Sequence, residues 1–301
     1  MVLTKENIRG IMPPMVTPFT EDEDLDEAAF RREAAYLLSL RTGALIVGGS
    51  TGEGASLAPE ELARGCEIAV EEARGRVPII AGVITDSARD AVRRGKLAKE
   101  AGVAGLMVTP IIYRVPTDNG LYEYYRRVHE EVGLPIIIYN VVPRAPVSPT
   151  LLARLAGLDG IIGVKESAAG DLDTLSDILS TVRSQIAVTW AQDPLLFPGF
   201  ALGAVGSISA INTVVPQLCI DLWEATERGD LAKAQECHFH ILPVARQLRR
   251  PNMTQRIKTA INLQGRPVGQ ARSPMIPLAA DEERQMAAAL EEAGVLQPLR
   301  N

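Results

Sequence analysis

The chain has 301 residues, of which 47% are hydrophobic and 23% charged, a balance typical of a globular protein with a sizeable core. Its formal net charge of -6 argues against nucleic acid as a partner, because phosphate binding needs a basic surface. The first residues do not form a signal peptide, and no apolar stretch reaches the roughly 18 residues that span a membrane. The three cysteines are widely spaced and predict free thiols, so we expect a cytoplasmic protein.

Short apolar runs alternate with longer amphipathic stretches along most of the chain. The runs are rich in Ile and Val and lack a polar–apolar alternation, which is typical of strands buried on both faces of a parallel sheet. The eight runs are 10–16, 44–48, 78–83, 105–109, 135–140, 160–166, 186–190 and 204–209. The helix-like segments that follow them are 25–40, 59–74, 87–101, 119–132, 150–155, 172–182, 195–202 and 215–228.

Eight strand–helix units in about 230 residues predict an α/β fold, a (β/α)8 TIM barrel, with an open doubly wound sheet as the alternative. No strand-like run follows Gly229. The remaining segments with helical character are 231–249, 254–264 and 281–293. We therefore predict a catalytic barrel over residues 1–228 and a small C-terminal helical domain over residues 229–301.

Lys165 is the penultimate residue of the sixth run and the first candidate for catalysis, because barrels place their active sites at the carboxyl ends of the strands. Burial at such an end disfavours the ammonium, and the neutral amine is the species that attacks a ketone to form an imine. The iminium then withdraws electrons from the neighbouring carbon, so an enamine forms without a metal or cofactor. On position alone, an ion pair with a carboxylate such as Glu166 is the more common role.

Tyr139 ends the fifth run and is the second candidate. A phenol there can pass protons between the amine, the carbinolamine and a bound aldehyde. A ring that only fills the mouth of the barrel is the commoner alternative.

A glycine-rich loop, Gly48-Gly49-Ser50-Thr51-Gly52-Glu53-Gly54, follows the second run. Its amides and the hydroxyls of Ser50 and Thr51 can hold an anion, such as the carboxylate of a keto acid. It lacks the lysine of a P-loop, and its glycines follow the second strand rather than the first, which speaks against a nucleotide loop. A plain tight turn explains any one glycine but not the full set.

Two further groups carry possible ligand chemistry. Arg144 lies five residues after Tyr139 and can clamp a second carboxylate, although a solvated loop arginine fits equally well. The cluster Cys237-His238-Phe239-His240 is the one possible group of metal ligands in the sequence. It lies in the predicted C-terminal helices and supplies no carboxylate, so we expect no metal site.

Taken together, these segments resemble the dihydrodipicolinate synthase / N-acetylneuraminate lyase family over nearly the whole chain. The matching residues are Thr17-Pro18-Phe19, Gly49-Ser50-Thr51-Gly52-Glu53, Thr109-Pro110, Tyr139-Asn140, Gly163-Val164-Lys165-Glu166-Ser167 and Gly206-Ser207-Ile208-Ser209. The resemblance implies a barrel enzyme that uses no cofactor and is usually a homotetramer. It also implies that Lys165 forms the Schiff base with pyruvate and that Tyr139 relays protons, with Ser50 linking it towards solvent.

The resemblance further implies the residues that bind substrate. Thr51 and the backbone of Ser50 would hold the pyruvate carboxylate, Gly49 belongs to the same loop, and Ile208 would line the pyruvate site. Synthases of the family carry a tyrosine pair after the Thr-Pro of the fourth strand, where this chain has two isoleucines, and Tyr113 is the candidate replacement. Arg144 sits where the synthases place the arginine for the aldehyde carboxylate.

The resulting prediction is a Schiff-base lyase of the dihydrodipicolinate synthase type, which condenses pyruvate with an aldehyde that bears a carboxylate. The alternative is a catabolic aldolase or dehydratase of a 2-keto-3-deoxy sugar acid or a related hydroxy-keto acid. A binding barrel without Schiff-base chemistry, or an oxidoreductase, is the third hypothesis. Neither nucleic acid nor a membrane is an expected partner.

Overall fold

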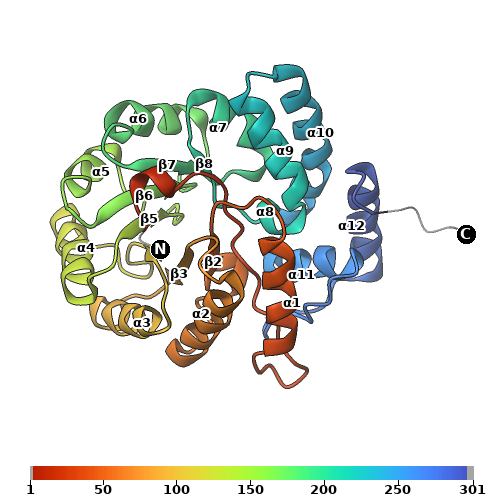
Figure 1. Ribbon diagram of the computed structural model, residues 1–301, viewed down its shortest axis with the longest axis horizontal. Coiled ribbons are helices and arrows are strands. Elements are labelled where there is room, and N and C mark those ends of the chain that lie inside the picture. Colours follow the sequence, from red (N-terminus) through yellow and green to blue (C-terminus); the bar gives the residue numbers. More distant parts are fainter. Residues whose placement is uncertain (1–2, 297–301) are drawn as a thin grey trace, which may run out of the picture.

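A computed structural model describes residues 3–296, and its strands form a barrel of eight parallel strands enclosed by helices (Figure 1). The strands pair in the order β1-β8-β7-β6-β5-β4-β3-β2. Their bounds are β1 Gly10–Ile11, β2 Leu45–Val47, β3 Ile79–Val83, β4 Gly105–Val108, β5 Ile136–Asn140, β6 Ile161–Glu166, β7 Ala187–Trp190 and β8 Gly206–Ser207. Strands β2 to β8 pair in their order along the chain, and β8 pairs with β1. A doubly wound sheet does not have this closed order, so the predicted (β/α)8 barrel is confirmed.

Helices follow the strands along the chain and cover the outside of the barrel (Figure 1). Their bounds are α1 Glu27–Leu38, α2 Pro59–Ala73, α3 Ala88–Glu100, α4 Asp118–Val132, α5 Pro149–Leu155, α6 Leu172–Val182, α7 Leu196–Leu202, α8 Ile211–Val214 and α9 Pro216–Glu227. The side chains of several residues cap these helices by accepting a backbone N–H of the first turn, namely Asp26, Ser87, Thr117, Ser148 and Asp171. The short α8 was not predicted.

The first strand is shorter than predicted, and its proline residues explain why. Pro13 and Pro14 have no amide hydrogen to donate, so they cannot extend a regular ladder. A single parallel bridge between Pro14 and Ile46 joins this segment to β2. Two hydrogen bonds support it, from the N–H of Met15 to Ile46 O at 2.8 Å and from the N–H of Ile46 to Pro13 O at 3.1 Å. This contact closes the barrel.

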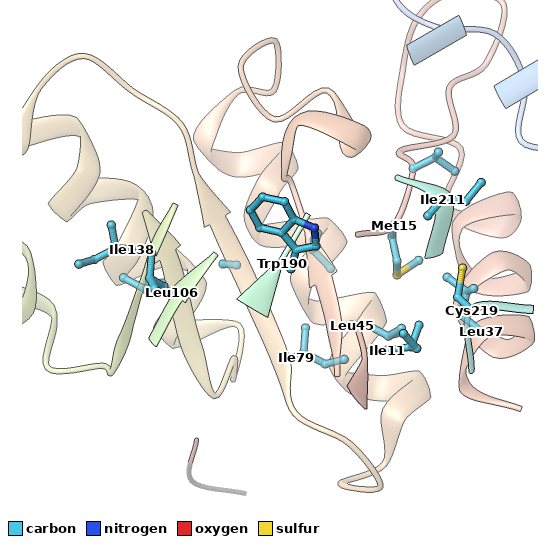
Figure 2. Packing of buried hydrophobic residues seen from close by; sticks show 14 of the residues in the cluster. Ile11, Met15, Leu37, Leu45, Ile79, Leu106, Ile138, Trp190, Ile211 and Cys219 are labelled. Atoms are coloured by element: carbon cyan, nitrogen blue, oxygen red, sulfur yellow. The ribbon is translucent and has the colours of Figure 1, made fainter. Parts of the chain in front are cut away.

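Side chains of the strands alternate between two hydrophobic clusters. In β5, Ile136 and Ile138 point outward and pack among the helices, in the cluster that Figure 2 shows around Trp190. Ile137 and Tyr139 belong to the second cluster, inside the barrel. Because successive strand residues face opposite sides, Tyr139 points inward at the carboxyl end of its strand.

Three helices follow the barrel and pack beside α8 and α9 (Figure 1). They are α10 Leu231–Leu248, α11 Met253–Leu263 and α12 Ala280–Glu292. The domain boundary predicted after residue 228 falls in the turn between α9 and α10, and a separate C-terminal domain stays a prediction. Between residues 3 and 296, no helix combines the length and the apolar character needed to cross a lipid bilayer.

Candidate active site

The carboxyl ends of β2, β5, β6, β7 and β8 surround a cavity of about 220 Å³. The end of α10 and the start of α11 complete its wall from the C-terminal region. The residues that line the cavity are Ser50, Thr51, Tyr139, Val141, Lys165, Ser167, Ala191, Gln192, Asp193, Ser209, Ala210, Arg249 and Met253. Its position at the strand ends is the one at which barrels of this kind carry out their chemistry.

Lys165 is the penultimate residue of β6, and its side chain lines the cavity. Its register partners are Tyr139 on β5 and Thr189 on β7. The residue is 6% exposed, and its Nζ lies 4.1 Å from the centroid of the Tyr139 ring. Within residues 3–296, Lys165 forms no ion pair, so the alternative of a salt bridge to Glu166 is not present. The amine therefore faces the cavity beside a phenol.

Tyr139 links the amine to the glycine-rich loop. Its hydroxyl donates to Ser50 Oγ at 3.0 Å, and the N–H of Ser50 donates back to the phenol oxygen at 3.4 Å. Burial raises the pKa of Tyr139, but the charge of Lys165 and the hydrogen bonds from Ser50 and Lys165 outweigh it. The pKa therefore lies below its ordinary value. A phenol with a lowered pKa between an amine and a hydroxyl can pass a proton in either direction.

The loop after β2 forms a short 3-10 turn, Ser50–Gly52, that presents Ser50 and Thr51 to the cavity. Two of its glycines are required by close packing. A Cβ at Gly52 would lie 2.6 Å from the Met15 carbonyl oxygen, and one at Gly54 would lie 1.7 Å from that of Gly48. The same segment thus forms a tight turn that requires glycines and presents two hydroxyls to the cavity. The tight turn and the anion-holding loop are therefore compatible interpretations of this segment.

Glu166, next to Lys165, points to the opposite side of the sheet and holds two active-site loops. It accepts a hydrogen bond from the Asn140 side chain, and its Oε1 accepts the N–H groups of Ala168 at 2.8 Å and Ala169 at 3.3 Å. The Oδ1 of Asn140 accepts the N–H of Val147 at 2.8 Å. Burial raises the pKa of Glu166 to about 7, against these hydrogen bonds, which lower it. The loops after β5 and β6 are therefore tied to each other.

The structure brings four of the eight predicted site residues together along the cavity: Lys165, Tyr139, Ser50 and Thr51. Gly49 and Ile208 are buried, and neither lines the cavity; Ile208 packs with Tyr139 inside the barrel.

The other two predicted residues lie outside the cavity. Tyr113 is 71% exposed, and its N–H donates to Asp86 at 2.8 Å. Arg144 is also exposed, in the loop after β5. The catalytic and binding roles of these eight residues remain predictions.

Several residues of the cavity were not predicted. Asp193 accepts hydrogen bonds from the Ser209 hydroxyl and from the N–H of Ile211, and burial raises its pKa. It follows β7 within three residues, so the rule that selected Lys165 could also have selected it. Arg249 and Met253 come from the C-terminal helices. No local sequence signal relates them to strands that end about 40 or more residues earlier.

The potential metal ligands of the sequence do not gather. Cys237 is buried in α10, and His238 stacks near Phe197 and Phe239, with ring centroids 6.0 Å and 5.4 Å apart. In the part of the chain from residue 3 to residue 296, no three His, Cys, Asp or Glu side chains form a possible metal site.

The fold and the site together define a (β/α)8 barrel of the class I aldolase type, with a buried lysine beside a tyrosine at the mouth of the barrel. The chain belongs to the dihydrodipicolinate synthetase family, whose model matches residues 7–293. The resemblance to this family that the sequence motifs carry is thereby confirmed.

Known proteins match this chain over almost its whole length. The 4-hydroxy-tetrahydrodipicolinate synthase of Methanococcoides burtonii is 35% identical over 291 residues, which are 96% of this chain and 99% of that protein. The crystal structure of dihydrodipicolinate synthase from Aquifex aeolicus superposes with a TM-score of 0.90 at 32% identity, covering 98% and 100% of the two chains. A chloride-inhibited dihydrodipicolinate synthase from Acinetobacter baumannii, complexed with pyruvate, gives a TM-score of 0.91 at 27% identity, covering 96% and 100%.

Proposed function

We propose that this protein is a Schiff-base lyase that condenses pyruvate with an aldehyde bearing a carboxylate, as 4-hydroxy-tetrahydrodipicolinate synthases do. The observation that carries the proposal is the line of groups from Lys165 Nζ through the Tyr139 phenol to Ser50 Oγ. The relative from Methanococcoides burtonii with that name and the family member crystallised with pyruvate support it. Pyruvate is therefore the proposed first substrate.

The first half of the proposed reaction forms the imine. The amine of Lys165, after passing a proton to the Tyr139–Ser50 relay, adds to the keto carbon of pyruvate, and the carbinolamine then loses water after its hydroxyl is protonated. Tyr139 is the proton donor within reach, and Ser50 resupplies it with a proton from the cavity. In this proposal the hydroxyl and N–H of Thr51 receive the pyruvate carboxylate.

The second half forms the new carbon–carbon bond. The methyl group of the iminium gives a proton to the Tyr139–Ser50 relay, which leaves an enamine, and the enamine carbon attacks the carbonyl carbon of the aldehyde. The aldehyde oxygen takes a proton as the bond forms, and the same phenol can supply it. Addition of water to the resulting imine releases the product and restores the amine of Lys165.

The proposed site for the second substrate is the wall of the cavity that Gln192, Asp193, Ser209 and Arg249 form. Arg249 lines this wall, and within residues 3–296 its guanidinium has no hydrogen-bonding or ion-pair partner. A carboxylate on the aldehyde would neutralise this charge through a bidentate contact. The cavity, at about 220 Å³, is smaller than the ~300 Å³ lower bound for drug-sized ligands, which suits short substrates.

A second candidate function rests on the polar groups of the same wall. Gln192, Asp193 and Ser209 can hydrogen-bond the hydroxyl groups of a sugar-derived tail. These residues favour aldol cleavage or dehydration of a 2-keto-3-deoxy sugar acid over a purely carboxylate-directed condensation. The carboxylate-bearing aldehyde is nevertheless the first choice, because Arg249 lines the same cavity and its guanidinium makes no hydrogen bond or ion pair within residues 3–296. Its charge acts on the buried carboxyl of Asp193 only at longer range.

A substrate panel separates the two candidates. The purified protein is given pyruvate with aldehydes that differ only in a terminal carboxylate, amide or hydroxymethyl group, and pyruvate consumption is followed. A parallel series supplies 2-keto-3-deoxy sugar acids, and pyruvate release is followed. The proposal expects turnover with the carboxylate and at least about tenfold less with the amide. Preferred turnover of a sugar acid would select the second candidate instead.

We also propose a homotetramer in the cytoplasm, as the family resemblance implies. Light scattering after size-exclusion chromatography measures the oligomer directly. A monomer at micromolar concentration would contradict this part of the proposal.

A further inference from the structure

The loop that carries Ser50 and Thr51 is held from outside the barrel through Glu53. This residue directly follows the turn and is 9% exposed. Its backbone lies in the left-handed region, with φ 57°. Residues other than glycine rarely adopt this conformation without support from their surroundings. Its N–H donates to the Ser50 carbonyl oxygen at 3.1 Å, so the place of Glu53 also sets the place of Ser50.

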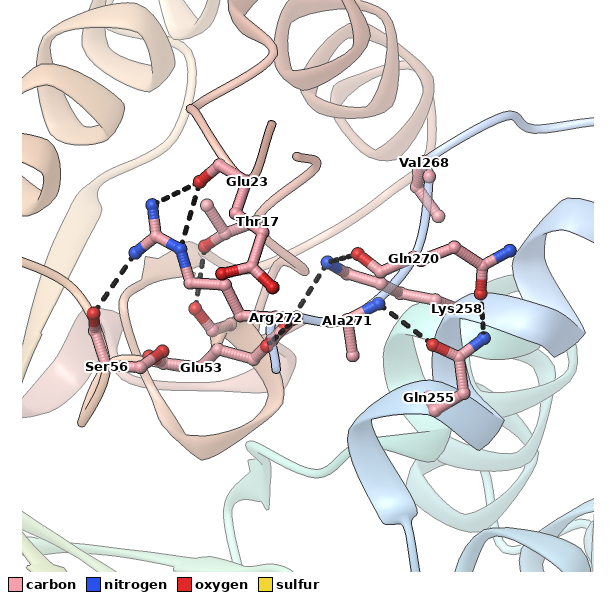
Figure 3. A network of polar contacts seen from close by, with 12 residues as sticks. Thr17, Glu23, Glu53, Ser56, Gln255, Lys258, Val268, Gln270, Ala271 and Arg272 are labelled. Atoms are coloured by element: carbon pink, nitrogen blue, oxygen red, sulfur yellow. Dashed lines mark hydrogen bonds and ion pairs between the residues drawn. The ribbon is translucent and has the colours of Figure 1, made fainter. Parts of the chain in front are cut away.

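Both carboxylate oxygens of Glu53 are held by residues of the C-terminal region (Figure 3). Lys258, in the middle of α11, places its Nζ 2.8 Å from Glu53 Oε1. The backbone N–H of Arg272 donates to Glu53 Oε2 at 2.9 Å. Lys258 is fully buried and also donates to the Gln270 carbonyl oxygen at 2.7 Å. The carboxylate is thus fixed by two segments more than 200 residues further along the chain.

Phe19 completes the contact between these two cations and the barrel. The Nζ of Lys258 lies 4.3 Å from the centroid of its ring, and the guanidinium carbon of Arg272 lies 4.1 Å from it. Two residues earlier, the hydroxyl of Thr17 donates to the Gly52 carbonyl oxygen at 2.7 Å, inside the turn. The ring therefore holds both cations, and the carboxylate holds Lys258 and the backbone of Arg272, against the segment that supports the Ser50–Thr51 turn.

We propose that Lys258 is a positioning residue for the binding of the 2-keto acid: through Glu53 it fixes the Ser50–Thr51 turn that receives the carboxylate. The inference rests on the proposed function and assigns the C-terminal region a part in it. Lys258 does not line the cavity and acts on substrate only through Glu53. Loss of the Lys258–Glu53 ion pair should therefore weaken the binding of pyruvate more than the binding of the aldehyde.

A neighbouring ion pair on the same helix supplies a matched control. Arg256 is two residues earlier on α11, its side chain is 3% exposed, and it pairs with Glu282 of α12. Its other hydrogen bond goes to the Pro251 carbonyl oxygen. Loss of either side chain removes a buried cation and its ion pair from α11, but only Lys258 is connected to the turn.

The test compares Lys258→Met with Arg256→Met in the full-length protein. Measurements are the free energy of unfolding, kcat and KM for each substrate, and the pyruvate concentration that half-saturates borohydride trapping. We expect Lys258→Met to raise the KM and the half-saturating concentration for pyruvate by about tenfold or more, with a smaller change for the aldehyde. Arg256→Met should lose stability and keep both pyruvate values within about twofold.

A double variant keeps the test informative if Lys258→Met does not fold. Glu53→Gln combined with Lys258→Met leaves no unpaired buried charge, so it should recover stability and still show weakened pyruvate binding. Wild-type pyruvate binding in a folded Lys258→Met or double variant would overturn the inference, as would an equal loss in Arg256→Met. A wild-type protein that traps no pyruvate would instead refute the proposed function, and this inference with it.

Discussion

The Nζ of Lys165 lies 4.1 Å from the centroid of the Tyr139 ring, and the two residues are register partners on adjacent parallel strands. Paired residues of parallel strands point to the same side of the sheet, so both side chains enter the cavity without any adjustment of a loop. The reacting amine and its proton donor are therefore fixed by the most rigid part of the fold, as a preorganised site requires.

Removal of the Tyr139 hydroxyl tests the proton relay. Tyr139→Phe should lower kcat by about 10²- to 10⁴-fold, because the amine and the carbinolamine lose their proton partner. The KM for pyruvate should change little, since the carboxylate contacts remain. Tyr125→Phe is the control, because that buried hydroxyl donates to the Val108 carbonyl oxygen at 3.2 Å, away from the cavity. Equal effects of the two variants would contradict a catalytic role for Tyr139.

A comparison of two arginines tests the second substrate site. If Arg249 binds the carboxylate of the aldehyde, Arg249→Ala should lower kcat/KM. The loss should correspond to about 2–4 kcal/mol of charge-assisted binding. A neutral aldehyde should show no such loss. Arg144→Ala examines the residue that the sequence predicts for this role, although the structure leaves its side chain exposed. Steady-state kinetics on both variants decide between them, and two unchanged values would favour a neutral polyol tail.

Glu166 gives a prediction for the dependence of stability on pH. Burial raises its pKa from the ordinary 4.5 to about 7, so the folded protein binds this proton more tightly than the unfolded chain does. Its contribution to stability is complete below pH 4.5 and is lost as the pH rises to about 7, by at most about 3 kcal/mol.

The measurement for Glu166 compares the wild type with Glu166→Gln by urea denaturation at several pH values. The wild type should lose stability relative to the variant between pH 4.5 and 7. Other carboxyl groups titrate equally in both proteins and cancel in the difference. A difference that does not change with pH would show that Glu166 is ionised throughout this range.

The strand ends account for what could be predicted from the sequence. Lys165 and Tyr139 end long apolar runs, and the barrel rule places such residues at the site without knowledge of any loop. The first run was predicted too long, since Pro13 and Pro14 interrupt the pairing of an otherwise apolar stretch. Gln192 and Asp193 follow the seventh run directly, so the same rule covers them.

The contribution of the C-terminal helices could not be predicted in this way. Lys258 lies on α11 and Arg249 directly follows α10, and the amphipathic pattern of these helices shows which face is buried but not which part of the barrel it contacts. Their place follows from packing between segments far apart in the chain, such as α11 against the turn after β2. Arg144 and Tyr113 belong to loops, where position in the sequence determines side-chain direction least.

The most direct test of the central claim is to trap the imine on Lys165. The protein is incubated with pyruvate, reduced with borohydride, digested and analysed by mass spectrometry. Imine formation releases one water, and reduction adds two hydrogens across the carbon–nitrogen bond, so the Lys165 peptide should carry a three-carbon acid on Nζ. The adduct should be absent from Lys165→Met and from samples without pyruvate. An unmodified Lys165 peptide in an otherwise folded wild-type protein would contradict the account.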